Sequence, residues 1–407
     1  MLTGRMRSSA TVVGKRRTCQ HCLHTLKVES SRIIYQRVQK MTTYLEPYNP
    51  PSWAKELKFI PKFRVQLAQP NTPIHKWHIP GAPERFSIHI KRDDMTGGTL
   101  SGNKVRKLEF LFADAIDQGC KHVCTVGGIQ SNHCRAVAVA ARQLGLVPHL
   151  LLRTSTTSPS DIGCDGNVLL NRMCGARMYI VPRPSPYITE LRPRQERLAE
   201  IIKQQTGEST YLIPVGGSNK VGLFGYISVF QELQAQGVLE NFDDIVFTCG
   251  SGGTAAGLSI ANYLTGSTLR CHGFVVCDDD VYFYNHIQET LEDVGLPHVN
   301  ARDIVDIVTG YKGKGYSISA DEELSFITDV SIQSGILLDP TYTGKAAFGM
   351  VQELSSNPGR FKGDRILFLH TGGVFGLFDG RMNSLLKTTN SETDNIKMWP
   401  VKTCDPS

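Results

Sequence analysis

From about residue 84 onward, short runs rich in β-branched and apolar residues alternate with stretches whose apolar residues recur at helical spacing. Such alternation is typical of parallel sheets flanked by helices, and it places active groups at the carboxyl ends of strands. The predicted fold class is therefore α/β. The predicted strands are residues 122–127, 147–153, 177–181, 210–215, 244–249, 272–277 and 365–370. The predicted helices include residues 132–144, 188–205, 223–236, 258–264, 320–334 and 345–354.

Composition excludes several classes of protein. The apolar share of 41% and charged share of 20% indicate an ordinary globular chain, and no apolar run reaches the ~18 residues needed to cross a bilayer. The net charge of +6 is concentrated in residues 1–40, which hold nine basic residues and one acidic residue. The remainder is mildly acidic, so we expect neither a nucleic-acid surface nor a membrane partner.

The basic leader, residues 1–40, is typical of an organellar transit peptide because it is rich in arginine and poor in acid. We therefore expect a mitochondrial location, or a cytoplasmic one if the leader is an ordinary basic tail. The eleven cysteines follow no secreted spacing, which favours reduced thiols. Segment 19–24 (CQHCLH) looks like half a zinc site, but no second pair follows at finger spacing, so we expect no metal.

Residues 41–83 are rich in proline and show little periodicity, which predicts an extended arm around the outside of the fold. Segment 101–107 (SGNKVRK) follows, and it places Lys104 where a glycine turn becomes a helix. Ser101 can cap that helix, and the positive end of the helix dipole disfavours the ammonium form of Lys104. A partly buried lysine there can form an imine with an aldehyde. The alternative is an ordinary solvated lysine.

Two predicted strands end in turns suited to binding anions. Segment 127–135 (GGIQSNHCR) enters a helix whose first N–H groups can hold a carboxylate, with Ser131 and Asn132 as further donors. Either residue could instead be a simple helix cap. Segment 250–257 (GSGGTAAG) can hold a phosphate on its N–H groups but lacks the lysine of a P-loop. It also matches the dinucleotide fingerprint, although the expected acidic residue is missing. A bare glycine turn is the remaining alternative.

Three further positions give only a weak functional signal when each is taken alone. Tyr342 lies in the loop before a predicted helix, Tyr316 lies in a glycine turn, and Thr371 follows the last predicted strand. Buried tyrosines are more often packing residues with a hydrogen-bonded tip.

Taken together, segments 90–97, 101–107, 127–135 and 370–373 occur in an order that resembles the pyridoxal-phosphate enzymes of the D-cysteine desulfhydrase and 1-aminocyclopropane-1-carboxylate (ACC) deaminase family. The resemblance runs from about residue 50 to about residue 378. It implies the fold-type-II arrangement, similar to the tryptophan synthase β chain, with pyridoxal 5′-phosphate as cofactor and an amino acid as substrate. The implied domains are residues 41–106 plus 219–387, and residues 107–218, with a loose tail at 388–407. We also expect a homodimer.

The resemblance implies a role for each motif. Lys104 would carry the cofactor and then act as general base, and Asn132 would bond the phenolic oxygen of the cofactor. Tyr316 and Tyr342 would lie near the cofactor and orient or protonate the leaving group. The phosphate cradle would consist of Ser251, Gly252, Gly253 and Thr254, with Thr371 also at the cofactor. The substrate carboxylate would be held by Ser131, Asn132 and His133.

Two positions bear on the reaction. ACC deaminases have Glu after the active tyrosine and Leu after the histidine of the last motif, whereas this chain has Thr343 and Thr371. Threonine would leave the pyridine nitrogen neutral, which suffices to expel thiolate but suits cyclopropane opening poorly. The resemblance therefore implies elimination of D-cysteine to pyruvate, ammonia and sulfide. The alternatives are ACC deamination, a nicotinamide oxidoreductase that uses segment 250–257, and a binding module without activity.

Overall fold

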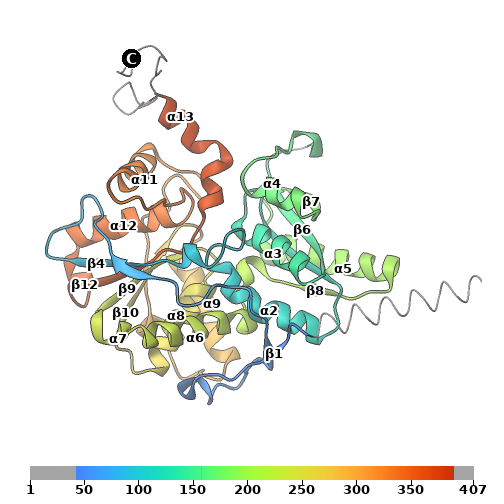
Figure 1. Cartoon of the computed structure of the whole chain (residues 1–407), viewed down its shortest axis with the longest axis horizontal. Helices are drawn as coiled ribbons and strands as arrows, with labels where there is room; N and C mark the ends of the chain where they lie inside the picture. The colour runs from blue at the N-terminus through green and yellow to red at the C-terminus, as the bar shows by residue number, and fades with distance from the viewer. Residues whose placement is uncertain (1–42, 157, 389–407) are drawn as a thin grey trace, which may run out of the picture. The chain divides into compact units, whose positions relative to one another are not determined.

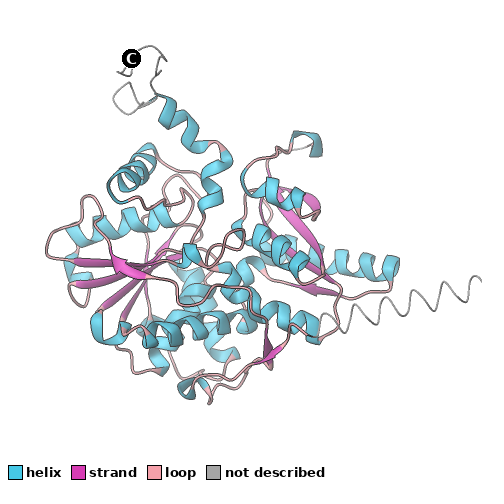
Figure 2. Cartoon of the chain, in the orientation of Figure 1, coloured by secondary structure: helices cyan, strands magenta, loops and turns pink. Residues whose placement is uncertain are grey.

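Two mainly parallel sheets dominate the computed structural model, which describes residues 43–156 and 158–388 (Figures 1 and 2). The larger sheet has the strand order β11-β10-β9-β12-β4-β3, and only the edge strand β3 is antiparallel to its neighbour. Its strands are β3 (Ile74–Lys76), β4 (Ser87–Lys91), β9 (Asp244–Cys249), β10 (Arg270–Val275), β11 (Asp306–Val308) and β12 (Arg365–Leu369). The smaller sheet, β7-β6-β5-β8, is wholly parallel and comprises β5 (His122–Gly128), β6 (Val147–Thr154), β7 (Arg177–Pro182) and β8 (Thr210–Leu212).

Helices cover both faces of each sheet, as the α/β prediction requires. Around the larger sheet, α11 and α12 lie on one side in Figure 1, and α6 and α8 lie on the other. These helices and their neighbours are α6 (Lys220–Ala235), α7 (Val238–Asn241), α8 (Gly253–Leu264), α9 (Asp280–Asp293), α10 (Ala301–Ile304), α11 (Asp321–Ser334), α12 (Thr343–Ser356) and α13 (Arg381–Thr388). The remaining helices are α2 (Lys104–Asp117), α3 (Asn132–Gln143), α4 (Gly166–Met173) and α5 (Arg192–Thr206).

Every predicted strand and helix is present, with ends that differ by a few residues. The sequence patterns missed β3, β4 and β11 and the helices α4, α7, α9, α10 and α13, most of which are short. The two sheets draw their strands from the two predicted domains, but the described residues from Tyr44 onward pack as one unit. The domain boundaries therefore stay a prediction. The predicted leader (1–40), with segment 19–24, and residues 389–407 of the predicted tail lie outside the described residues.

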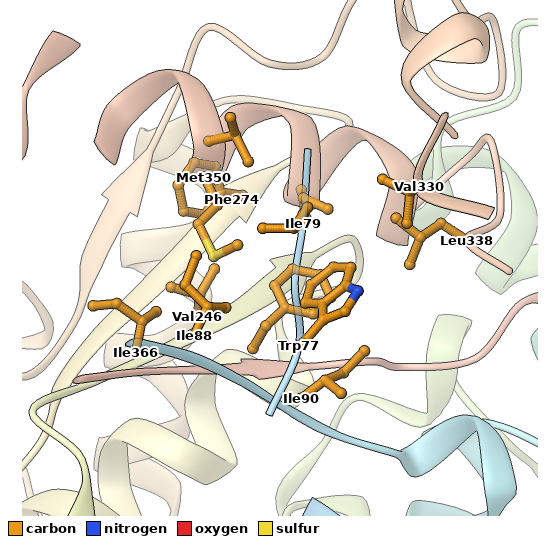
Figure 3. Packing of buried hydrophobic residues seen from close by; sticks show 14 of the residues in the cluster. Trp77, Ile79, Ile88, Ile90, Val246, Phe274, Val330, Leu338, Met350 and Ile366 are labelled. Carbon is orange, nitrogen blue, oxygen red and sulfur yellow. The ribbon is translucent and has the colours of Figure 1, made fainter. Parts of the chain in front are cut away.

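The expectation of an external arm over residues 41–83 is only partly right. An outer hairpin does form from β1 (Glu46–Pro47) and β2 (Phe63–Arg64). However, β3 joins the larger sheet, and Trp77 is buried in the core beneath α12 (Figure 3). Burial of the large apolar side chain of Trp77 removes its surface from water and thereby stabilises this inward course of the segment. None of the described helices is long and apolar enough to cross a membrane.

A buried ionic network fixes the start of α2. Arg106 donates to Asp93 at 2.7 Å and to Glu232 of α6 at 2.7 Å, and Lys91 of β4 also pairs with Glu232. Burial alone would raise the pKa of Glu232, but the two cations lower it to about 2. Because removing one partner of such a buried network leaves an uncompensated charge, the network holds α2 against the sheet. Lys104, two residues before Arg106, is positioned by this anchor.

Candidate active site

The carboxyl ends of β9 and β12 meet the first residue of α2 around a cavity whose empty space is about 480 Å³, a figure that includes space open to solvent. Its walls come from the loop before Lys104, the loop after β9 and the loop after β12, together with Asn132 and Tyr342. A wider cleft of about 1740 Å³, which includes space open to solvent, shares Lys104 and Tyr342 with this cavity. Ser131, His133 and Tyr316 line the cleft. The fold thus brings the separate sequence motifs to one place.

Lys104 is the first residue of α2 and projects into both spaces. Among the described residues, its amine has no hydrogen-bond partner. Burial lowers the pKa of Lys104 to about 8, while the nearby thiols of Cys277 and Cys249 act in the other direction. In about a tenth of the protein molecules, the Lys104 amine is therefore neutral at pH 7. A neutral, unpartnered amine in a cavity is suited to attack on a carbonyl carbon or to proton abstraction.

Two glycines allow the loops around Lys104 to approach each other. Gly102 has φ +101° and Gly372 has φ +90°, a region that side-chain-bearing residues rarely adopt. A Cβ on Gly372 would lie 2.5 Å from the Cα of Gly102, so no larger residue fits there. The N–H of Asn103 donates to the carbonyl of Thr371 at 3.0 Å and locks this contact. The turn before Lys104 is therefore fastened to the end of β12.

The loop after β9 forms a polar cradle at the start of α8. Ser251, Gly252 and Thr254 line the cavity, whereas the N–H of Gly253 donates to the hydroxyl of Ser218 at 3.2 Å. That hydroxyl also lies 2.8 Å from Oγ of Ser251. The cradle combines backbone donors, hydroxyls and the positive end of a helix, which is the arrangement that binds phosphate.

Lys107 is a functional candidate that the sequence patterns did not reveal. Its side chain is almost fully buried, and its ammonium donates to Oγ of Ser218 at 3.4 Å, beside the start of α8. Burial and the nearby Lys104 hold the pKa of Lys107 well below its usual range. No carboxylate among the described residues forms an ion pair with it. The sequence feature that could have revealed Lys107 is its position three residues after Lys104, which places both side chains on one face of α2.

The start of α3 presents donors to the cleft. Ser131 caps the helix by accepting from the N–H of Cys134 at 3.2 Å, so the cap interpretation holds and the hydroxyl proton stays available. His133 is buried, and its Nε2 lies 2.9 Å from Oγ1 of Thr125, whose own proton goes to the carbonyl of Ile213. Nε2 must then carry the proton of the neutral ring. Burial, with Lys104 and Lys107, keeps the pKa of His133 well below its usual range.

This placement limits how His133 could help to hold the substrate carboxylate. The free ring nitrogen, Nδ1, is buried, has no hydrogen-bond partner among the described residues and can only accept. The imidazole therefore cannot donate to a substrate anion. The backbone N–H of His133 in the first turn of α3 remains the group that can do so.

Tyr316 and Tyr342 form a hydrogen-bonded pair over the cavity. Their hydroxyl oxygens lie 2.6 Å apart, and Tyr342 immediately precedes α12. Burial raises the pKa of both phenols, for Tyr342 well above its usual value. Both hydroxyls thus stay protonated and can donate a proton near Lys104. The structure brings together two residues that the sequence marked only weakly.

Thr343 does not face the cavity. Its hydroxyl donates to the carboxylate of Asp339 at 2.8 Å and accepts from the N–H of the same residue at 2.9 Å. It is fully buried, and it is absent from the walls of both the cavity and the cleft. The expectation that Thr343 lies at the pyridine nitrogen is therefore wrong in this structure. Thr371 does line the cavity.

The cavity walls fit the cofactor that the sequence resemblance implies. Two hydroxyls that line the cavity, those of Ser101 and Thr248, are buried without a hydrogen-bond partner among the described residues. Buried polar groups normally have partners, so these indicate a polar ligand. The cradle at α8 and the ammonium of Lys107 suit a phosphate, and the amine of Lys104 suits an aldehyde. The donor set therefore matches pyridoxal 5′-phosphate.

Comparisons with known proteins agree with this geometry. Residues 65–372 match the family described as pyridoxal-phosphate dependent enzyme. The bifunctional D-cysteine desulfhydrase/1-aminocyclopropane-1-carboxylate deaminase, mitochondrial, of Arabidopsis thaliana is 45% identical over 349 residues, which are 84% of this chain and 86% of that protein. A putative 1-aminocyclopropane-1-carboxylate deaminase of Thermotoga maritima is 37% identical over 77% of this chain and 97% of that protein.

Solved structures give the same result. The crystal structure of an ACC deaminase homologue has a TM-score of 0.70 at 34% identity, and the match covers 83% of this chain and 99% of the other. O-ureido-L-serine synthase matches with a TM-score of 0.57 at 15% identity, over 79% of this chain and 95% of the other, and indicates the shared fold alone.

Proposed function

Because this chain belongs to the pyridoxal-phosphate-dependent enzyme family, we propose that it is a D-cysteine desulfhydrase, a carbon–sulfur lyase that uses pyridoxal 5′-phosphate. The reaction converts D-cysteine and water to pyruvate, ammonia and hydrogen sulfide. One observation carries the proposal. The amine of Lys104, the donor-rich start of α3 and the Tyr316–Tyr342 hydroxyl pair line two spaces with shared walls, in a protein that is 45% identical to a bifunctional D-cysteine desulfhydrase/ACC deaminase.

Each group of residues has a distinct task in this proposal. When bound, the cofactor supplies an electron sink for the α-carbon of the substrate. The N–H groups at the start of α3, with the hydroxyl of Ser131, hold the substrate carboxylate. Lys104, neutral in part at physiological pH, removes the α-proton as general base. The first residues of α3 thus orient the bond that Lys104 breaks.

The tyrosine pair handles the leaving group. Because the pKa of each phenol is raised, Tyr342 can hold its proton until sulfur departs and then donate it. Tyr316, at 2.6 Å from Tyr342, orients that hydroxyl and can replace its proton. Asp339 fixes the backbone that carries Tyr342, since its Oδ2 accepts from the N–H of Tyr342 at 3.0 Å.

Seven residues would bind the cofactor itself. The phosphate would be held by Ser251, Gly252 and Thr254 together with the ammonium of Lys107. Gly253 would contribute through the N–H that Ser218 now occupies. Asn132 would donate to the phenolic oxygen, and Thr371 would lie near the ring.

The pH dependence of cofactor uptake tests the assignment of Lys104. The rate at which the apoprotein takes up pyridoxal phosphate is expected to rise about tenfold from pH 7 to pH 9 and then level off. The reason is that the neutral fraction of an amine with a pKa of about 8 rises from about a tenth to about nine tenths over this range. The growth of visible absorbance after mixing measures this rate. A rate that keeps climbing beyond pH 10 would mean that the reacting amine has an ordinary pKa.

ACC deamination is the second candidate function. It is favoured by the name of the Arabidopsis relative, which includes both activities, and by the putative deaminases among the other relatives. The residue pattern favours D-cysteine, since Thr371 replaces the leucine of ACC deaminases at the cavity wall. Family membership speaks against the nicotinamide oxidoreductase and the inactive binding module.

Assays of both substrates decide between the two reactions. Wild type is expected to release sulfide and pyruvate from D-cysteine with a kcat/KM at least about tenfold above that for ACC. Thiolate can leave without a protonated pyridine nitrogen, whereas opening the cyclopropane of ACC needs a stronger electron sink. Pyruvate formation measures both reactions, and L-cysteine serves as the stereochemical control. A higher kcat/KM for ACC would reverse the order of the two candidates.

We further propose a mitochondrial location and a homodimer. The location is supported by the mitochondrial name of the Arabidopsis relative and by the basic composition of residues 1–40. The homodimer rests on the family resemblance alone. Light scattering of the purified protein gives its mass in solution directly.

A further inference from the structure

Asn132, at the cavity wall, is the end of a buried hydrogen-bond chain that begins at a guanidinium. Nε of Arg135 donates to Oδ1 of Asn167 at 3.3 Å. Nδ2 of Asn167 donates to Oδ1 of Asn132 at 3.0 Å and to the carbonyl of Gln130 at 3.1 Å. Asn167, on α4, lies 35 residues from Asn132 in sequence and is fully buried.

The groups that contact Asn167 in this hydrogen-bond chain determine the orientation of the side-chain amides of Asn167 and Asn132. Arg135 has only donors, so the atom of Asn167 that faces it must be the oxygen. The carbonyl of Gln130 can only accept, so the nitrogen of Asn167 faces Gln130 and Asn132. That nitrogen in turn requires the oxygen of Asn132. The nitrogen of Asn132 is therefore left as a donor, and among the described residues it has no partner.

The local backbone is built for this contact. Gly166, just before Asn167, has φ +50°, and a Cβ there would lie 2.7 Å from Oε1 of Gln130. That oxygen accepts from the N–H of Asn167 at 2.8 Å. Asn167 is thus tied to the 130–132 turn by its backbone as well as by its side chain.

The guanidinium of Arg135, at the start of this hydrogen-bond chain, has no acid partner among the described residues. Arg135 is almost fully buried, forms no ion pair with any described residue, and donates through its two terminal nitrogens to the carbonyls of Thr99 and Ser101. Burial lowers the pKa of Arg135 to about 10, still well above physiological pH. Its positive charge therefore polarises the amides between it and the cavity. The same guanidinium holds the loop that leads into Lys104.

We propose that Asn167 is a positioning residue which, with Arg135, holds the amide of Asn132 as a hydrogen-bond donor toward the phenolic oxygen of the cofactor. The inference rests on the proposed role of Asn132 but not on the choice of substrate. A donor at that oxygen stabilises negative charge there, so it lowers the pKa of the bound chromophore and strengthens cofactor binding.

The decisive variant is Asn167→Asp, which is isosteric and still accepts from Arg135 but cannot donate to Asn132. Because two oxygens would then face each other, the amide of Asn132 is expected to turn and present its oxygen to the cavity. We expect the midpoint of the visible pH titration of the holoenzyme to rise by about one unit and the cofactor Kd to rise about tenfold. Asn167→Ala, which places no acid in the core, is measured beside it.

Asn171 offers a matched control on the same helix. It is also fully buried, but both polar atoms of its side chain lack partners among the described residues. Asn171→Leu is therefore expected to leave the titration midpoint and the cofactor Kd unchanged.

A double-mutant cycle with Asn132→Ala separates positioning from general damage to the fold. Combining Asn132→Ala with Asn167→Asp is expected to weaken cofactor binding no further than Asn132→Ala alone, because Asn167 acts only through Asn132. Full additivity of the two effects, or wild-type behaviour of both Asn167 variants, would overturn the inference. A shifted midpoint in a protein that leaves D-cysteine untouched would support it while contradicting the proposed substrate.

Discussion

Replacing Lys104 with alanine is expected to remove the visible absorbance of the bound cofactor and to lower kcat by about 1000-fold or more. The amine is the group at the cavity that can bind an aldehyde covalently, and it is also the proposed base at the α-carbon. Removing it eliminates both tasks at once. Absorbance spectra of the purified protein and sulfide release from D-cysteine measure the two losses separately.

The fold of the Lys104→Ala variant is expected to persist. The side chain makes no hydrogen bond among the described residues, and the ionic network of Arg106 still anchors α2. Lys203→Ala, at an exposed lysine of α5, is the matched control and should retain both absorbance and turnover. Full sulfide release by Lys104→Ala would disprove the assignment of this residue.

Lys107→Met is expected to raise the Kd for pyridoxal phosphate about a hundredfold while leaving the apoprotein as stable as wild type or more so. In the apoprotein, the amine of Lys107 is buried and has no acid partner among the described residues, so burial and the nearby Lys104 disfavour its charged form. A phosphate at the start of α8 would compensate that charge. Equilibrium titration gives the Kd, and thermal melting with and without the cofactor gives the two stabilities.

Lys345 provides the contrasting control for that experiment. It is as deeply buried as Lys107, but its ammonium donates to the carbonyls of Lys312, Gly315 and Ile318 at 2.6–3.0 Å. Lys345→Met leaves the carbonyls of Lys312 and Ile318 without this donor and removes the cation 3.7 Å from Glu323, so the melting temperature of its apoprotein is expected to fall. If Lys107→Met lowers apoprotein stability in the same way and binds the cofactor normally, Lys107 is a structural residue.

Local sequence signals predicted most elements that build the site. The strand at Asp244–Cys249 was predicted with its observed ends, because a buried run bounded by acidic and glycine residues is a local pattern. The start of α2 at Lys104 and the cap of α3 by Ser131 likewise depend on residues adjacent in the chain. The short strands β3 and β11 were missed because three residues carry too little periodicity.

Burial and pairing between distant segments decided what the sequence patterns missed. Lys107 became a candidate because packing of α2 against Ser218 and the start of α8 buries its ammonium. Asn167 reaches Asn132 only because α4 packs on α3. No local pattern carries this information, because each contact joins residues tens of positions apart.

The sequence by itself determined most of the longer strands and helices, and which chemical groups stand at strand ends, because hydrophobic periodicity and turn residues act locally. Only the tertiary structure decided where individual side chains point. Thr343, adjacent to Tyr342, turns to Asp339 instead of the cavity, and the ring of His133 turns its proton to Thr125. These choices depend on which donors and acceptors the fold brings within about 3 Å of each other, since a buried polar group takes the partner that satisfies it.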